Sequence, residues 1–120
     1  MKRIALAILL IGSIYMLDSC YYDKGDVLVT TCDTSLHTYG KVIRPILDHY
    51  CLSCHNNNNP TAAVSVEDWE DVKQLADEGR LLGVIRHEAG YVAMPLDQPQ
   101  MLPCDIRNVE LWVADGAPNN

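Results

Sequence analysis

The sequence has 120 residues, enough for one small domain, and it is acidic, with 9 Lys and Arg residues against 16 Asp and Glu residues and a formal net charge of −7. Recognition of nucleic-acid phosphates needs a basic surface, so the charge argues against nucleic-acid binding. The acidity favours solubility, and it either steers the protein toward a basic patch on a partner or is a solvated surface without that role.

The first twenty residues have the pattern of an export signal. Lys2 and Arg3 precede an uncharged, mostly apolar run from Ile4 to Leu17, which is the arrangement of a secretory signal peptide. This run is shorter than the ~20 residues that cross a bilayer as a helix, and polar residues follow it at once, which favours a cleaved signal over a retained membrane anchor. We therefore expect an exported protein of the cell envelope.

The signal ends in Leu17-Asp18-Ser19-Cys20, which resembles the lipobox of bacterial lipoproteins, although Asp18 replaces the usual small residue. The resemblance implies that residues 1–19 are removed and that Cys20 receives a lipid, which anchors the protein to a membrane, facing the periplasm or the cell surface. The mature chain would then hold 7 basic and 15 acidic residues, a net charge of −8. The alternative is an ordinary cleavage site with Cys20 nearby by chance.

Residues 20–37 are predicted to be a tether, or N-terminal arm, ahead of a domain that spans residues 38–120. The arm begins with polar and aromatic residues that show no period, and Val27 to Thr31 is predicted to be a short strand or an extended segment. We expect the arm to end by packing on the domain, with Cys32 as its staple.

A first helix is predicted from Lys41 to Tyr50, because apolar residues recur there at helical spacing and Pro45 falls in the first turn. This helix leads directly into Cys51. The segment from Asn56 to Ala63 is predicted to be a loop, since Asn and Pro favour turns.

A second helix is predicted to begin at Ser65, whose hydroxyl would cap it, with acidic residues in the first turn. Its apolar repeat runs to Ala76, and Gly79 marks a break before a third helix over residues 80–87. The stretch from 90 to 101 contains two prolines and is predicted to be non-helical.

The final helix is predicted from about Pro103 to Ala114, followed by the stop signals Gly116 and Pro118. Its apolar stripe includes Val109, and strand signals are almost absent from the domain. The sequence therefore predicts an all-α fold of about four short helices.

Cys51-Leu52-Ser53-Cys54-His55 has the Cys-x-x-Cys-His spacing of a c-type haem attachment site. The two thiols add to the vinyl groups of the porphyrin, and the adjacent histidine coordinates the iron from one face. The spacing matters because both sulfurs and the imidazole must reach one planar ring. We predict one covalent haem c, held by Cys51 and Cys54, with His55 as an iron ligand.

The motif has three other possible interpretations. A thioredoxin-like redox motif directly follows a strand, whereas a helix is predicted to lead into Cys51. A disulfide between Cys51 and Cys54 leaves His55 without a role. A structural zinc site needs four ligands, and no second paired spacing is found among the remaining candidates, His37, His49, His87 and Cys104.

The five cysteines can be allocated by elimination. If Cys20 takes a lipid and Cys51 and Cys54 take the haem, Cys32 and Cys104 remain. In an oxidising compartment we expect these two to form a disulfide, and the alternative is a pair of buried free thiols.

Three segments of the domain share the pattern of one protein family, namely Val42–Leu47 leading into the Cys51–His55 motif, His87–Pro95, and Ile106–Ala117. With them the domain resembles the class I cytochrome c family, in particular small monohaem lipoproteins, over roughly residues 38–117. It departs from the family at Asn56 to Asn59, where small residues are common. The resemblance implies a small helical bundle around one haem.

In that family a Met-Pro pair before the last helix gives the second axial ligand, and the resemblance implies this role for Met94, which precedes Pro95. A thioether is a soft ligand that raises the reduction potential. The rivals are Met101, which we expect to pack beside the last helix, and His87, which we expect to be a helix-end histidine.

The remaining histidines and the tryptophans are given no chemical role. We expect His37 and His49 to be surface or capping residues, and Trp69 and Trp112 to pack in the core or against the haem.

The resemblance implies an electron carrier and not an enzyme, so no catalytic residues are assigned. Such a protein passes single electrons to or from a redox partner protein at the cell envelope. One alternative is a haem sensor or peroxidase-like protein whose distal ligand is absent or displaceable, and another is a structural lipoprotein with a disulfide framework.

Overall fold

The computed structural model describes residues 32–120, which form one compact unit. The predicted signal peptide, the lipobox with Cys20 and the extended segment Val27 to Thr31 lie outside the described residues. Within residues 32–120, no helix has the length and apolar character needed to span a membrane.

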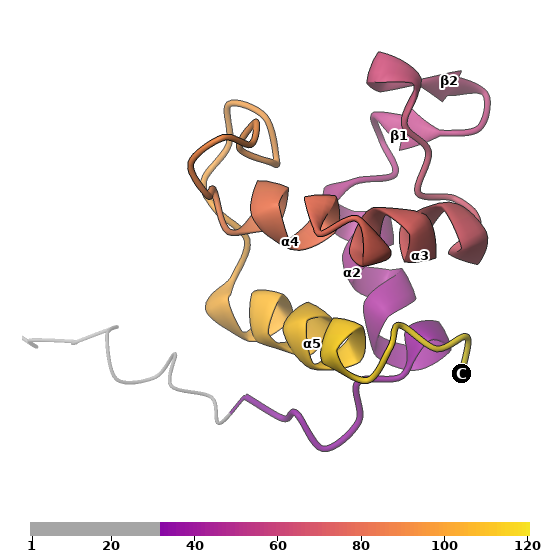
Figure 1. Cartoon of the computed structure of the whole chain (residues 1–120), viewed down its shortest axis with the longest axis vertical. Helices are drawn as coiled ribbons and strands as arrows, with labels where there is room; N and C mark the ends of the chain where they lie inside the picture. The colour runs from indigo at the N-terminus through magenta and orange to yellow at the C-terminus, as the bar shows by residue number, and fades with distance from the viewer. Residues whose placement is uncertain (1–31) are drawn as a thin grey trace, which may run out of the picture. The chain divides into compact units, whose positions relative to one another are not determined.

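The described residues are mainly helical with almost no strand, which confirms the all-α prediction at that level (Figure 1). Four α-helices carry the fold, namely α2 (Arg44–Tyr50), α3 (Trp69–Asp77), α4 (Arg80–Ile85) and α5 (Pro103–Ala114). A π-helical turn η2 (Tyr39–Ile43), a 3-10 turn η3 (Thr61–Ala63) and the two-residue strands β1 (His55–Asn56) and β2 (Asn59–Pro60) complete the described elements.

The first helix begins two residues earlier than predicted, as the turn η2 that runs on into α2. Pro45 lies in the first turn of α2, where a residue without an N–H group is tolerated. The helix ends when the Cys51 N–H donates to the Leu47 carbonyl, at 2.9 Å. The Cys-x-x-Cys-His motif therefore starts where α2 stops, as the sequence predicts.

The segment after the motif differs in detail from the predicted loop. Residues 55–60 form a tight antiparallel hairpin in which His55 pairs with Pro60 and Asn56 with Asn59. The Asn58 N–H donates to the side-chain oxygen of Asn56, at 3.1 Å, the local bond by which Asn shapes turns. Turn chemistry was predicted here, but the pairing of the two short strands was not.

The other helices follow the sequence with one correction. Helix α3 begins at Trp69 and not at Ser65, because the Ser65 hydroxyl accepts a hydrogen bond from Glu67 N–H (3.1 Å) in a turn ahead of the helix. Gly79 adopts a φ of +74° between α3 and α4, a left-handed conformation that suits glycine. Helix α4 ends at Ile85, two residues before the predicted end.

The core is centred on Trp112 in α5, which is fully buried with its ring centroid 5.6 Å from that of Tyr39. Its indole N–H donates to the Pro118 carbonyl at 2.9 Å, and the indole of Trp69 donates to the Ala117 carbonyl at 3.1 Å. Both tryptophans therefore act as packing residues that hold the segment after α5. The other most deeply buried side chains are Ile43, Leu47, Val72 and Val109.

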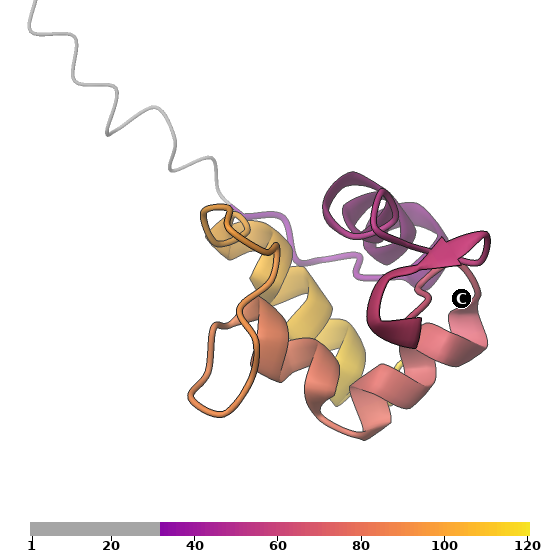
Figure 2. The same cartoon turned by 90° about the horizontal axis from the view of Figure 1, so that it is seen from above.

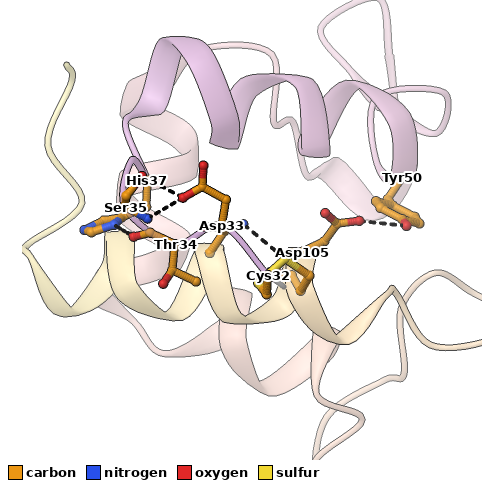
Figure 3. Close-up of a disulfide and its surroundings, with 9 residues drawn as sticks. Cys32, Asp33, Thr34, Ser35, His37, Tyr50 and Asp105 are labelled. Atoms are coloured by element: carbon orange, nitrogen blue, oxygen red, sulfur yellow. Dashed lines mark hydrogen bonds between the residues drawn. A yellow bond between two sulfur atoms is a disulfide. The ribbon is translucent and has the colours of Figure 1, made fainter. Parts of the chain in front are cut away.

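The arm from residue 32 to residue 37 runs along α5 (Figure 3). Cys32 and Cys104, the pair left by the allocation of cysteines, form a disulfide with a Cα–Cα distance of 5.4 Å in the first turn of α5. At the other end, the His37 ring bonds the Asp115 carboxylate at 2.6 Å, a contact that raises the pKa of His37. The arm is thus stapled twice, and His37 is a fastening point that the sequence did not indicate.

Two segments outside the helices project from the same side of the unit, above α4 and α3 in Figure 1. One is the stretch from the motif through β1, β2 and η3, and the other is the loop from residue 86 to residue 101. Seen from above in Figure 2, the two segments stand apart, with the 86–101 loop at the left and the β1/β2 segment at the right. The predicted haem-attaching residues lie in the first segment and Met94 lies in the second.

Candidate haem-attachment site

The motif folds as a single tight turn at the end of α2. The N–H groups of Cys54 and His55 both donate to the Cys51 carbonyl, at 3.1 and 3.0 Å. Both thiols are free, with Cys51 half-buried and Cys54 exposed. The turn therefore gathers two thiols that are not in a disulfide and one imidazole within five residues, which is the donor set that covalent haem attachment requires.

The surroundings of Cys51 favour a protonated thiol. Burial raises its pKa to about 11, and the nearby Arg44 guanidinium opposes this only in part. Redox-active Cys-x-x-Cys pairs depend on a thiol whose pKa is lowered, since the thiolate is the reactive form. The environment of Cys51 thus argues against the thioredoxin-like interpretation of the motif.

His55 has one ring nitrogen committed and the other available for a metal. Its Nδ1 lies 3.2 Å from the Val64 carbonyl oxygen. Because a carbonyl oxygen can only accept, Nδ1 carries a hydrogen, and in the neutral form of the ring this tautomer has its lone pair on Nε2. Metal-binding histidines commonly donate their second ring nitrogen in this way, which fixes the tautomer and the ring orientation.

Asn57 braces the segment that presents the Val64 carbonyl. Its backbone N–H donates to the Glu67 carboxylate at 2.7 Å, and its side-chain amide donates to Asp68 at 2.8 Å. The Ser65 hydroxyl donates to the Asn57 side-chain oxygen at 2.6 Å. The sequence placed Asn57 in a loop without a role, and its only signal was its position two residues after the motif histidine.

Met94 lies in the loop between α4 and α5, and its backbone is bonded on both sides. Its N–H donates to the Val84 carbonyl at 3.0 Å, and its own carbonyl accepts from His87 Nε2 at 3.0 Å. The residue is half-buried. Met101, the rival methionine, is 3% exposed and belongs to the core, as expected of a residue beside the last helix.

Apolar side chains around Met94 are left exposed to an unusual degree. Val92 is 61% exposed and Leu96 is 59% exposed, on either side of Met94. Tyr91 and Leu102 are also exposed, at 41% and 64%. A porphyrin is a flat, largely apolar group that would cover exposed apolar side chains beside a ligand. The side chains next to Met94 are therefore compatible with a haem.

Residues 32–120 contain no group of three or more His, Cys, Asp or Glu side chains that could hold a metal ion. A hollow of about 230 Å³ beside Val64 and Leu75 includes none of Cys51, Cys54 and His55. His49 is exposed beside Tyr50, as expected of a surface residue.

Comparisons with protein-family models, with curated proteins and with solved structures give no match for this chain.

Proposed function

We propose that this protein is an electron-transfer cytochrome with one haem c bound covalently through Cys51 and Cys54, and with His55 and Met94 as axial ligands. One observation carries the proposal. The Cys-x-x-Cys-His turn holds two free thiols beside a histidine whose Nδ1 hydrogen is committed to the Val64 carbonyl, so that Nε2 is free to bind iron.

The haem supplies the one-electron chemistry when bound, and the chain's residues hold and tune it. Val64 fixes the direction and tautomer of the His55 ring. The Met94 thioether would stabilise the reduced state as a soft, neutral ligand. The apolar side chains of Val92 and Leu96 would exclude water from that face. One-electron transfer by a haem requires no proton transfer from a side chain, so the proposed function needs no catalytic residue.

The charge of the chain suits a redox partner protein with a basic patch at the cell envelope, because opposite fields speed the encounter. A lipid on Cys20 would keep the protein at the membrane where that partner works.

Two methionine variants test the axial ligand. The oxidised protein is expected to show the charge-transfer absorption band of a methionine–iron bond, and Met94→Ala is expected to abolish it. Met101→Leu is the matched control, since it removes the other sulfur while nearly conserving the buried volume, and the band should persist.

The opposite pattern would point to the haem sensor or peroxidase-like alternative. A high-spin spectrum in the wild-type protein, with ready binding of carbon monoxide, would mean that the position opposite His55 is open. A band that survives in Met94→Ala would assign the ligand to another residue.

A further inference from the structure

We infer that His87 is a positioning residue that holds Met94 in place as an iron ligand. This role rests on the function proposed above, because it concerns the same site. Its main support is the hydrogen bond between the His87 ring and the Met94 carbonyl. The backbone conformation of His87 and the packing of Tyr91 on α4 add to it.

His87 is placed to reach Met94 by the end of α4. Its φ of +55° turns the chain after the helix, and its N–H donates to the Val84 carbonyl at 3.3 Å. From there Nε2 lies 3.0 Å from the Met94 carbonyl oxygen. Since that oxygen can only accept, Nε2 is the donor. The ring therefore closes a loop across seven residues onto the proposed ligand.

The same short stretch of chain holds Met94 from its other side. The Met94 N–H donates to the Val84 carbonyl, the group that also accepts the His87 N–H. Both backbone polar groups of Met94 are thus bonded to residues 84 and 87. The main chain of the proposed ligand is therefore fixed at two points. A fixed main chain limits the directions that the Met94 side chain can take.

Two residues between His87 and Met94, Glu88 and Tyr91, fold back onto α4. A methyl group added at Gly83 would lie 2.6 Å from the Tyr91 ring, which shows how closely that ring approaches the helix backbone. The Glu88 N–H donates to the Gly83 carbonyl at 3.0 Å, and the Tyr91 N–H donates to Glu88 at 3.1 Å. This packing pre-shapes the loop, and His87 closes it.

A hydrogen bond that closes a loop lowers the fraction of time that the loop is open. The net free energy of an ordinary hydrogen bond changes the equilibrium constant for opening by up to about tenfold. An added ligand such as imidazole can take the place of a methionine only when the methionine leaves the iron. Loss of the His87 bond is therefore expected to make that replacement easier by up to about tenfold, without changing the haem attachment.

The test is an imidazole titration of the oxidised haem-loaded protein, followed by the loss of the methionine–iron band. His87→Asn is the main variant, because Asn tolerates the left-handed backbone but is too short to reach the Met94 carbonyl. We expect imidazole to bind about five- to tenfold more tightly to it than to the wild type. His87→Leu should behave alike, and His87→Gln, whose amide can replace the Nε2 donor, should return toward the wild type.

Gln100→Ala is the matched control. The Gln100 side chain donates to the Ile85 carbonyl at 3.1 Å, so it fastens the same loop to the same helix without contacting Met94. We expect its imidazole affinity to stay within about twofold of the wild type, since it leaves both bonds of Met94 in place.

Two results would overturn the role of His87. The first is an unchanged imidazole affinity in both His87→Asn and His87→Leu, and the second is an equal increase in Gln100→Ala, which would mean general loosening of the loop. Failure of the proposed function looks different, because the wild-type protein itself would then lack the methionine–iron band before any imidazole is added.

Discussion

Replacement of Trp112 by alanine is expected to destabilise the domain by about 3–5 kcal/mol, the usual cost of removing a buried tryptophan. Trp112 has no exposed surface, and its ring packs beside that of Tyr39 in η2. The truncation would leave a cavity where α5 meets the first helix, and it would also free the Pro118 carbonyl, which accepts from the indole.

Urea denaturation followed by far-ultraviolet circular dichroism measures this loss without relying on tryptophan fluorescence. Trp112→Phe should cost about 1–3 kcal/mol, because it keeps much of the apolar volume but leaves the Pro118 carbonyl without a donor. Leu36→Ala, at a site 60% exposed, should change stability by no more than about 0.5 kcal/mol. If Trp112→Ala were as mild as Leu36→Ala, the described core would be wrong.

Loss of the Cys32–Cys104 disulfide is expected to cost about 4 kcal/mol, because the bond closes a loop of 72 residues and so restricts the unfolded chain. The double variant Cys32→Ser/Cys104→Ser avoids a stray thiol. Its urea midpoint is expected to fall while its native absorption spectrum stays unchanged, since neither residue belongs to the motif or to the Met94 loop.

The remaining staple of the arm provides a comparison for the disulfide variant. His37→Ala removes the bond to Asp115, a solvent-exposed carboxylate, while leaving the covalent bond in place. Exposed ion pairs contribute little, so its effect should be far smaller than that of the disulfide. An equal loss in the two variants would contradict the account in which covalent closure dominates.

Elements set by local sequence could be predicted from the sequence. Pro103 and Gly116 bracket α5, and Gly79 separates α3 from α4, because each acts through its own backbone conformation. The start of α3 was misplaced because Ser65 has the chemistry of a cap, while the fold commits its hydroxyl to Asn57 and Glu67. Sequence shows what a side chain can bond, but not which partner the fold supplies.

The candidate site likewise has a part that the sequence predicts and a part that only the fold brings together. Cys51, Cys54 and His55 lie within five residues of one another, so their spacing alone predicts haem attachment. The partners that orient the proposed ligands are separated from them in sequence, as Val64 is from His55 and His87 is from Met94. No periodicity marks such pairs, and the sequence predicts His87 to be a helix-end residue, with iron ligation as the alternative.

The two proposed ligands are held in different ways. His55 lies at the edge of a hairpin that is fastened by Asn57 and by backbone bonds. Met94 lies in a loop that depends on two backbone bonds and on the packing of Tyr91. We expect the Met94 side to be the first to open, because exposed loops with few buried contacts are the least stable parts of a fold.

The intact mass of the exported protein, made in cells with a cytochrome c maturation system and then denatured, tests covalent haem attachment most directly. We predict that the wild-type chain keeps the added mass of one haem after denaturation, and that Cys51→Ser/Cys54→Ser loses it. A wild-type chain without that added mass, with Cys51 and Cys54 joined to each other or left as free thiols, would contradict the account.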